Sequence, residues 1–134
     1  MVLRAEVKAD LAPKCVMVVD DDAVIRLVLS ESLRDGGLHV VEASCSADAI
    51  AYLRSGAAVD LIFSDIQMAG PFDGLLLAHH VRAIYPDLPM ILTSSGVKPS
   101  GLTEAEIFIR KPYRLDDILA VVRTNLGFKD NDPE

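Results

Sequence analysis

The sequence predicts an α/β fold, with helices on both faces of one doubly wound parallel sheet. Five short apolar runs recur along the chain, and helical segments or helix-ending residues follow them. Strands that alternate with helices favour a parallel sheet with right-handed crossovers. With 134 residues, 51% of them hydrophobic, the chain is long enough for one sizeable core. We expect one domain at residues 14–127, a leader at residues 1–13 and an acidic tail at residues 128–134.

The strands are predicted from short runs that contain β-branched residues. They are Cys15–Val19, Leu38–Glu42, Leu61–Ser64, Met90–Ser94 and Ile107–Arg110. Four helices are predicted from apolar spacing and from residues that begin or end helices. They run from about Asp22 to Asp35, from Ser46 to Ser55, from near Asp73 to the residues before Pro86, and from Arg114 to Leu126.

The ends of these helices can be read from particular residues. Glycine commonly ends a helix. It follows the first, second and last helices at Gly36-Gly37, Gly56 and Gly127. Ser46 is expected to be the N-cap of the second helix. In the third helix, we expect Leu77, Val81 and Ile84 to form one apolar stripe.

The connection between the last two strands is too short for an ordinary helix. It contains Gly96, Pro99 and Gly101, which leave room for one helical turn between Ser94 and Ile107. The sequence therefore predicts a loop or a very short helix in this crossover.

The composition limits the classes of partner. A formal net charge of −7 without a basic patch argues against nucleic acid, which is bound largely through clustered Lys and Arg. No apolar run approaches the length of a membrane span, and the N-terminus lacks the apolar stretch of a signal peptide, so we expect a soluble cytoplasmic protein. Cys15 and Cys45 are too few for a disulfide framework and are expected to be small buried hydrophobic residues.

Charged residues follow three predicted strands at the point where each strand ends. They are Asp20 and Asp21 after the first strand, Asp65 after the third and Lys111-Pro112 after the fifth. In an open doubly wound sheet, ligands bind in the crevice at the carboxyl ends of the strands. Carboxylates packed together need a cation to remain ionised, and an all-oxygen site selects a hard ion such as Mg²⁺. The sequence thus predicts a magnesium site if the first and third strands are neighbours.

The same edge of the sheet has the parts needed for phosphoryl transfer. Lys111 can reach about 10 Å across two strands, and its charge can neutralise phosphoryl oxygens. An aspartate can be the nucleophile, and Ser94 adds a hydroxyl at the end of the fourth strand. Each residue alone has a structural explanation, such as a helix cap for Asp20 or a turn for Asp65. Their coincidence at one sheet edge favours a functional site.

A set of motifs extends over most of the chain, from about Lys14 to Leu126. The motifs are Val-Val-Asp20-Asp21-Asp22, Ser64-Asp65-Ile66-Gln67-Met68 leading to Asp73-Gly74, Thr93-Ser94, Phe108 and Lys111-Pro112. As a set they resemble the receiver domain of response regulators, the phosphoacceptor half of two-component signalling. The resemblance implies a flavodoxin-like sheet with strand order 2-1-3-4-5.

The resemblance also implies a role for each acidic residue of the site. It implies that Asp65 accepts the phosphoryl group. Asp20 and Asp21 would hold Mg²⁺ together with Asp65, and the backbone carbonyl of Gln67 would supply a further ligand. The protein would then be a Mg²⁺-dependent phosphoacceptor and, at most, a weak catalyst of its own phosphorylation and dephosphorylation.

Beyond the acids, the resemblance implies that Ser94 and Lys111 contact the phosphoryl group and that Ser94 and Phe108 form a switch pair. The chain also departs from the family. Ala69 stands where a proline is usual, one extra residue precedes Asp73, and the fourth helix is shortened or missing. That helix belongs to the face that most receivers use for dimerisation or output, so we expect this face to be altered.

The first predicted helix carries an apolar band too wide for one buried stripe. Its members are Val24, Ile25, Leu27, Val28, Leu29 and Leu33. We hypothesise that Val24, Ile25 and Val28, with Pro112, dock the phosphodonor, a histidine kinase or a histidine phosphotransfer protein. The alternative is that all six pack internally or are scattered surface residues.

The chain ends soon after the last helix, so its output is expected to be a downstream protein or phosphorelay itself. It would act as a single-domain regulator, either a monomer or a phosphorylation-dependent dimer. A degenerate receiver that acts independently of phosphorylation is the main alternative. An aspartyl-phosphate phosphatase would need an acid where Gln67 stands. His39, His79 and His80 are expected to be structural residues.

Overall fold

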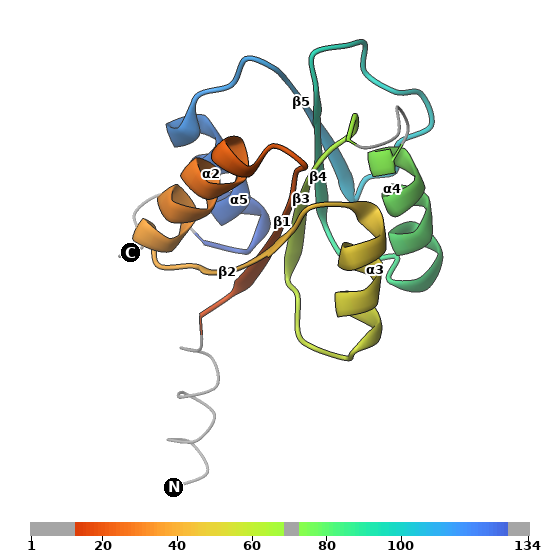
Figure 1. Cartoon of the computed structure of the whole chain (residues 1–134), viewed down its shortest axis with the longest axis horizontal. Helices are drawn as coiled ribbons and strands as arrows, with labels where there is room; N and C mark the ends of the chain where they lie inside the picture. The colour runs from red at the N-terminus through yellow and green to blue at the C-terminus, as the bar shows by residue number, and fades with distance from the viewer. Residues whose placement is uncertain (1–12, 69–72, 129–134) are drawn as a thin grey trace, which may run out of the picture.

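One parallel sheet forms the centre of the protein. The computed structural model describes residues 13–68 and 73–128, so most of the predicted leader and tail lies outside the described residues. The strands are β1 (Cys15–Val19), β2 (His39–Ala43), β3 (Leu61–Asp65), β4 (Met90–Ser94) and β5 (Glu106–Arg110). Their order is β2-β1-β3-β4-β5 (Figure 1). The predicted fold class and strand order are confirmed.

Helices cover both faces of the sheet. The described residues form α2 (Ala23–Asp35), α3 (Ser46–Arg54), α4 (Asp73–Ile84) and α5 (Leu115–Asn125). In Figure 1, α2 and α5 lie on one face, and α3 and α4 lie on the other. Each face has its own core of buried side chains, one around Phe63 and Ile118 and the other around Met17 and Leu77. Among the described residues, no helix is long and apolar enough to cross a membrane.

The helix ends agree with the sequence in some places and differ in others. Gly37, Gly56 and Gly127 follow their helices with φ of 87°, 84° and 91°, a conformation that glycine adopts without steric cost. The expectation for Ser46 was wrong, because it is the first residue of α3 and Cys45 is the N-cap. Cys45 provides no side-chain cap.

A residue distant in the sequence satisfies the start of α3 instead. The Asp73 carboxylate accepts the Ser46 backbone N–H at 3.1 Å and the Ser46 hydroxyl at 2.5 Å. The first turn of α3 is therefore held by the first residue of α4. A serine inside the first turn supplied a misleading signal, because its hydroxyl donates to a carboxylate and does not accept a backbone N–H.

The apolar stripe predicted for α4 is only partly buried. Leu77 and Val81 are buried, whereas Ile84 is 53% exposed, so the core covers only the first two residues of the stripe. Ile84 is the last residue of α4. Pro86 follows closely, and the residue before a proline disfavours the helical conformation. The helix thus ends before another turn can cover this side chain.

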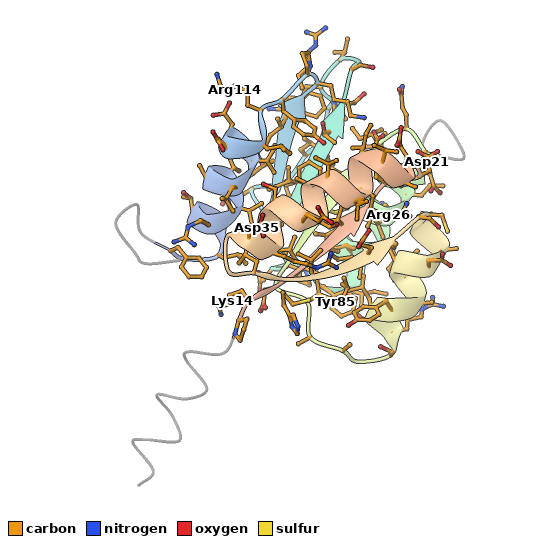
Figure 2. The ribbon with its side chains drawn as sticks, turned by 60° about the vertical axis from the view of Figure 1, so that its left-hand side comes forward. Lys14, Asp21, Arg26, Asp35, Tyr85 and Arg114 are labelled. Atoms are coloured by element: carbon orange, nitrogen blue, oxygen red, sulfur yellow. The ribbon has the colours of Figure 1, made fainter. Side chains whose placement is uncertain are left out.

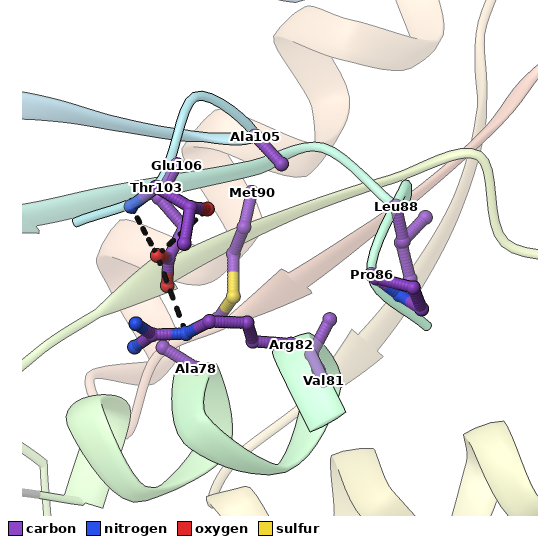
Figure 3. A pocket seen from close by; sticks show the side chains of 9 residues that line it. All are labelled: Ala78, Val81, Arg82, Pro86, Leu88, Met90, Thr103, Ala105 and Glu106. Carbon is purple, nitrogen blue, oxygen red and sulfur yellow. Dashed lines mark hydrogen bonds and ion pairs between the residues drawn. The ribbon is translucent and has the colours of Figure 1, made fainter. Parts of the chain in front are cut away.

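The crossover between β4 and β5 has no helix in residues 95–105, all of which the structure describes. Its last part is fastened to α4 through Glu106 (Figure 3). Glu106 Oε1 accepts the backbone N–H and the hydroxyl of Thr103 and lies 3.6 Å from Arg82 Nε. Arg82 also donates to the Gly101 carbonyl at 3.1 Å. The prediction of a loop is confirmed, and an ion pair anchors it.

Gly74 brings the start of α4 against the end of β3. Its N–H donates to the Ile66 carbonyl at 2.9 Å. A Cβ on Gly74 would lie 2.2 Å from the Asp65 carbonyl oxygen, so only glycine allows this approach. The loop that connects Asp65 to α4 is consequently closed by backbone contact. Residues 69–72 of that loop, which begin with Ala69, lie outside the described residues.

Candidate functional site

Three aspartates meet at the carboxyl end of the sheet. β1 pairs with β3, which brings the residues after β1 beside the last residue of β3. One carboxylate oxygen each from Asp20, Asp21 and Asp65 lies within 4.8 Å of the others. Asp20 and Asp65 are 2% and 6% exposed, whereas Asp21 is exposed to solvent. The structure therefore gathers the three acids that the sequence placed at strand ends.

Hydrogen bonds on three sides fix Asp20. Its backbone N–H donates to the Ala43 carbonyl of β2 at 3.1 Å. Its carboxylate accepts the Asp22 N–H at 2.9 Å, and its carbonyl accepts Arg26 Nη1 at 2.6 Å. Asp22 is itself the N-cap of α2, with its carboxylate accepting two backbone N–H groups. The turn that presents the acids is thus tied to both β2 and α2.

Asp65 has one contact on each carboxylate oxygen. Oδ1 accepts the Gln67 backbone N–H at 3.2 Å, and Oδ2 forms an ion pair with Lys111 Nζ at 3.1 Å. Lys111 follows β5, two strands from β3, so its side chain reaches across the end of β4. Its own backbone N–H donates to the Ser94 carbonyl at 2.9 Å. The predicted reach of Lys111 is therefore achieved in the structure.

Burial of like charges changes the acid–base properties of the site. Burial raises the pKa of Asp20 above its ordinary value, and repulsion from Asp65 and Asp21 adds to this effect. The Asp22 N–H and Lys111 partly oppose the rise. The pKa of Tyr113 is raised by burial and by the charges of Asp20 and Asp65. A cation bound beside these carboxylates would reduce the repulsion between them.

The chemistry of the donors fits a hard divalent ion. The three groups that can approach a common point are carboxylates, two of them buried. Such oxygen donors suit Mg²⁺, which binds one or two carboxylates and keeps several waters. The Gln67 side chain is exposed, and its backbone N–H faces Asp65. The residues present therefore fit the ion that the sequence implied.

The remaining predicted residues lie along β4 and β5. Ser94 is buried, and its hydroxyl accepts the Gly96 N–H at 2.9 Å. Phe108 is half-buried and lies beside Leu92, two residues before Ser94 in β4. Ser94 thus stands at the strand end next to Asp65, and Phe108 packs below it into the core under α3 and α4.

An apolar groove borders the acidic cluster. It lies between α2 and the segment after β5, and Val24, Ile25, Val28, Leu29, Lys111, Pro112, Tyr113 and Leu115 line it. Of the six apolar residues noted in α2, Leu29 and Leu33 are buried and the other four are exposed. The four residues predicted to dock a partner thus line one groove beside the pocket.

Two residues of the site were missed in the sequence. Arg26 gave no signal, because its contact with the Asp20 carbonyl depends on how α2 packs. Tyr113 could have been noticed, because it follows Lys111-Pro112 directly. Its ring packs edge-on against Phe63 with centroids 5.8 Å apart.

The histidines lie away from the carboxyl ends of the strands. His39 begins β2, and His79 and His80 lie within α4, so none of the histidines ends a strand.

The sequence and the fold are both similar to known proteins. The family model described as "Response regulator receiver domain" matches residues 16–123. The C4-dicarboxylate transport transcriptional regulatory protein DctD of Rhizobium meliloti is 34% identical over 117 residues, which are 84% of this chain and 25% of that protein. The sensor histidine kinase CheAY of Helicobacter pylori is 29% identical over 83% of this chain and 15% of its own length.

Solved structures agree with the family match. A response regulator receiver protein from Sinorhizobium medicae WSM419 is 30% identical with a TM-score of 0.78, covering 87% of this chain and 97% of that chain. The chemotaxis response regulator CheY4 of Vibrio cholerae is 25% identical with a TM-score of 0.73, covering 85% and 99%. The chain spans about a quarter of the length of the first sequence relatives.

Proposed function

The chain belongs to the response regulator receiver domain family, and on this premise we propose that it accepts a phosphoryl group on Asp65. The observation that carries the proposal is the Lys111 ion pair with Asp65, 3.1 Å long, beside two further carboxylates. This arrangement puts a nucleophilic carboxylate next to a fixed positive charge. Receiver domains are signalling phosphoacceptors and are not enzymes in the ordinary sense.

The proposed step transfers a phosphoryl group from a phosphohistidine. A carboxylate oxygen of Asp65 attacks phosphorus, the new O–P bond forms as the N–P bond breaks, and the electron pair returns to the imidazole. Lys111, now paired with Asp65, would contact a phosphoryl oxygen and compensate its charge. The Ser94 hydroxyl accepts the Gly96 N–H and would donate its own proton to another phosphoryl oxygen.

We propose that Asp20, Asp21, Asp65 and the Gln67 carbonyl hold Mg²⁺. When bound, the ion would neutralise charge on the phosphoryl oxygens. The support from this chain is the oxygen-only donor set, two of whose three carboxylates are buried. Burial, with a smaller contribution from the neighbouring carboxylates, raises the pKa of Asp20, and a bound cation would offset both effects.

The groove beside the pocket is the proposed docking surface for the phosphodonor, a histidine kinase or a phosphotransfer protein. Val24 and Val28 are exposed, and Pro112 lines the same groove. Exposed apolar side chains at a groove suit contact with a helix of the partner. Phosphorylation would then alter the pair Ser94 and Phe108. The output would be binding to a downstream protein, dimerisation with a second copy of the chain, or transfer of the phosphoryl group to another phosphotransfer protein.

Incubation with acetyl phosphate and Mg²⁺, followed by intact-mass measurement, tests the phosphoacceptor. The wild type should gain one phosphoryl mass and Asp65→Asn should gain none. Asp48→Asn, which changes an exposed aspartate of α3, should behave as the wild type. A phosphorylated Asp65→Asn variant would contradict the assignment to this residue.

The second candidate is an interaction module that works without phosphorylation. The observation that favours it is the crossover of residues 95–105, which lacks a helix at the place where the family carries part of its output face. A wild type that gains no phosphoryl mass from acetyl phosphate or from phosphorylated kinases, even under rapid quenching, would support this candidate over the first.

A further inference from the structure

Arg26 connects the acidic cluster to the edge of the sheet. Its side chain is 20% exposed and lies between α2 and β2 (Figure 2). Nη1 donates to the Asp20 carbonyl at 2.6 Å, and Nε forms an ion pair with Glu42 Oε1 at 3.2 Å. Hydrogen bonds from a charged donor are stronger than neutral ones, so this short contact restrains the Asp20 backbone.

Glu42 contacts Arg26 directly and also pairs with a second arginine. Its other carboxylate oxygen, Oε2, lies 3.3 Å from Arg34 Nη2. Arg34 also donates to the Val40 carbonyl at 3.2 Å. Glu42 is a residue of β2, so strand pairing places it. Arg34 contacts Glu42 without reaching the acids, whereas Arg26 contacts Asp20 itself. The two arginines share one carboxylate, but only Arg26 contacts Asp20.

The Asp20 backbone is consequently held at both of its polar groups. Its N–H donates to Ala43 and its carbonyl accepts Arg26, while its carboxylate is aimed by the Asp22 N–H. A metal site needs carboxylates at set positions, and groups that hold the ligands in place commonly determine affinity. Without Arg26, a carbonyl in a residue that is 2% exposed would lose its partner.

We infer that Arg26 is a positioning residue that sets the affinity of the acidic cluster for Mg²⁺. This inference rests on the proposed metal site and deepens it. Position and charge act in opposite directions here. Removing a positive charge near three carboxylates should strengthen cation binding by Coulomb's law, whereas loss of the carbonyl contact should weaken it. The sign of the change therefore tells which effect dominates.

Isothermal titration with Mg²⁺ on the full chain measures the affinity directly. Arg26→Ala should raise the dissociation constant about tenfold or more, the usual effect of losing a group that orients a metal ligand. Arg26→Gln, which removes the charge but keeps an amide donor, should fall between the wild type and Arg26→Ala. Arg34→Ala is the matched control, because it removes a positive charge and a Glu42 contact but leaves Asp20 alone. It should bind Mg²⁺ as the wild type does.

A second readout separates positioning from general damage. At saturating Mg²⁺, Arg26→Ala should be phosphorylated by acetyl phosphate at close to the wild-type rate, with the defect confined to the Mg²⁺ concentration required. Equal or tighter Mg²⁺ binding by Arg26→Ala would overturn the inference, as would an equal loss in Arg34→Ala. If circular dichroism shows that Arg26→Ala is not folded, Arg26→Gln and Glu42→Gln take its place. Their Mg²⁺ dissociation constants are then compared with those of the wild type and of Arg34→Ala. A wild type without Mg²⁺ binding would instead contradict the proposed metal site.

Discussion

At the scale of single residues, Asp20 shows what the proposed metal site costs in stability. Its carboxylate is buried beside two others, and burial together with their repulsion raises its pKa. A carboxyl group whose folded pKa is above its unfolded value weakens the fold once it ionises. The cost begins as pH rises past the ordinary carboxyl value and is complete above the raised folded value. At neutral pH the metal-free protein bears this cost.

Asp20→Asn should therefore stabilise the metal-free protein at neutral pH. We expect the melting temperature to rise by a few degrees, the range that about 1 kcal/mol produces in a domain of this size. The gain over the wild type should shrink as pH falls into the range where Asp20 is protonated. Thermal unfolding followed by circular dichroism, in EDTA at several pH values, measures this.

Addition of Mg²⁺ should reverse the order of the two proteins, because the wild type gains more stability from the ion. At ten times its dissociation constant, Mg²⁺ should stabilise the wild type by about 1.4 kcal/mol and Asp20→Asn by much less. A variant that melts below the wild type in EDTA at neutral pH would show that the Asp20 carboxylate supports the metal-free fold, contrary to this account.

The predictability of the site also differs from residue to residue. Asp20, Asp65 and Lys111 could be found because each follows an apolar run, and parallel strands bring such positions to one edge. The cap on α3 could not be found, because Asp73 is 27 residues from Ser46. Arg26 was missed for a similar reason, since its partners lie on β2 and in the turn after β1. Contacts between elements leave no local pattern in the sequence.

At the scale of elements, the crossover between β4 and β5 is the most unusual part of the fold. The lack of an ordinary helix was predictable from Gly96, Pro99 and Gly101, which leave room for one helical turn at most. The means of fastening it was not predictable. Glu106 is buried, with a side chain 4% exposed, and Arg82 compensates its charge from α4. The Thr103 N–H and hydroxyl supply further donors to the same carboxylate.

Arg82→Ala should destabilise the protein by about 2 kcal/mol, because it leaves a buried carboxylate without its cation. The value is below that of a fully buried pair, since Arg82 is partly exposed. Glu106→Gln, which keeps an oxygen for Thr103, should cost less. Urea unfolding provides the free energies.

Arg54→Ala is the matched control for Arg82→Ala. It removes an exposed arginine from the last turn of α3 and should change stability by less than about 0.5 kcal/mol. An Arg82→Ala variant as stable as this control would show that the ion pair does not fasten the crossover.

At the scale of the whole molecule, the pocket and the groove form one continuous surface. Lys111 belongs to both, because it pairs with Asp65 and also lines the groove. A partner seated against α2 would thus stand directly beside Asp65, the proposed phosphoacceptor. The exposed apolar side chains of α2 indicate the side from which a partner would approach the pocket.

Ile25→Glu should slow phosphotransfer from a cognate histidine kinase by about tenfold or more, because a charged group at a central apolar contact must be desolvated on docking. Leu27→Glu adds the same charge to the same helix at a 49% exposed residue, and Leu27 does not appear among the described residues of the groove. Radiolabelled phosphotransfer time courses compare the two variants.

Phosphorylation by acetyl phosphate separates docking from chemistry, because this small donor needs no protein surface. The two glutamate variants should react with acetyl phosphate at similar rates and differ only with the kinase. Equal rates with the kinase would remove Ile25 from the docking surface.

The helix-free crossover has a consequence for protein engineering. Its first part carries Val97, which is 86% exposed, while its ion-paired anchor lies further along at Glu106. Exposed segments of this kind accept inserted domains and new chain termini more readily than packed helices do. A fluorescent reporter placed between Val97 and Ser100 would sit close in sequence to Ser94 without interrupting a strand or helix. The loop could thus serve as the attachment point of a biosensor for the state of Asp65.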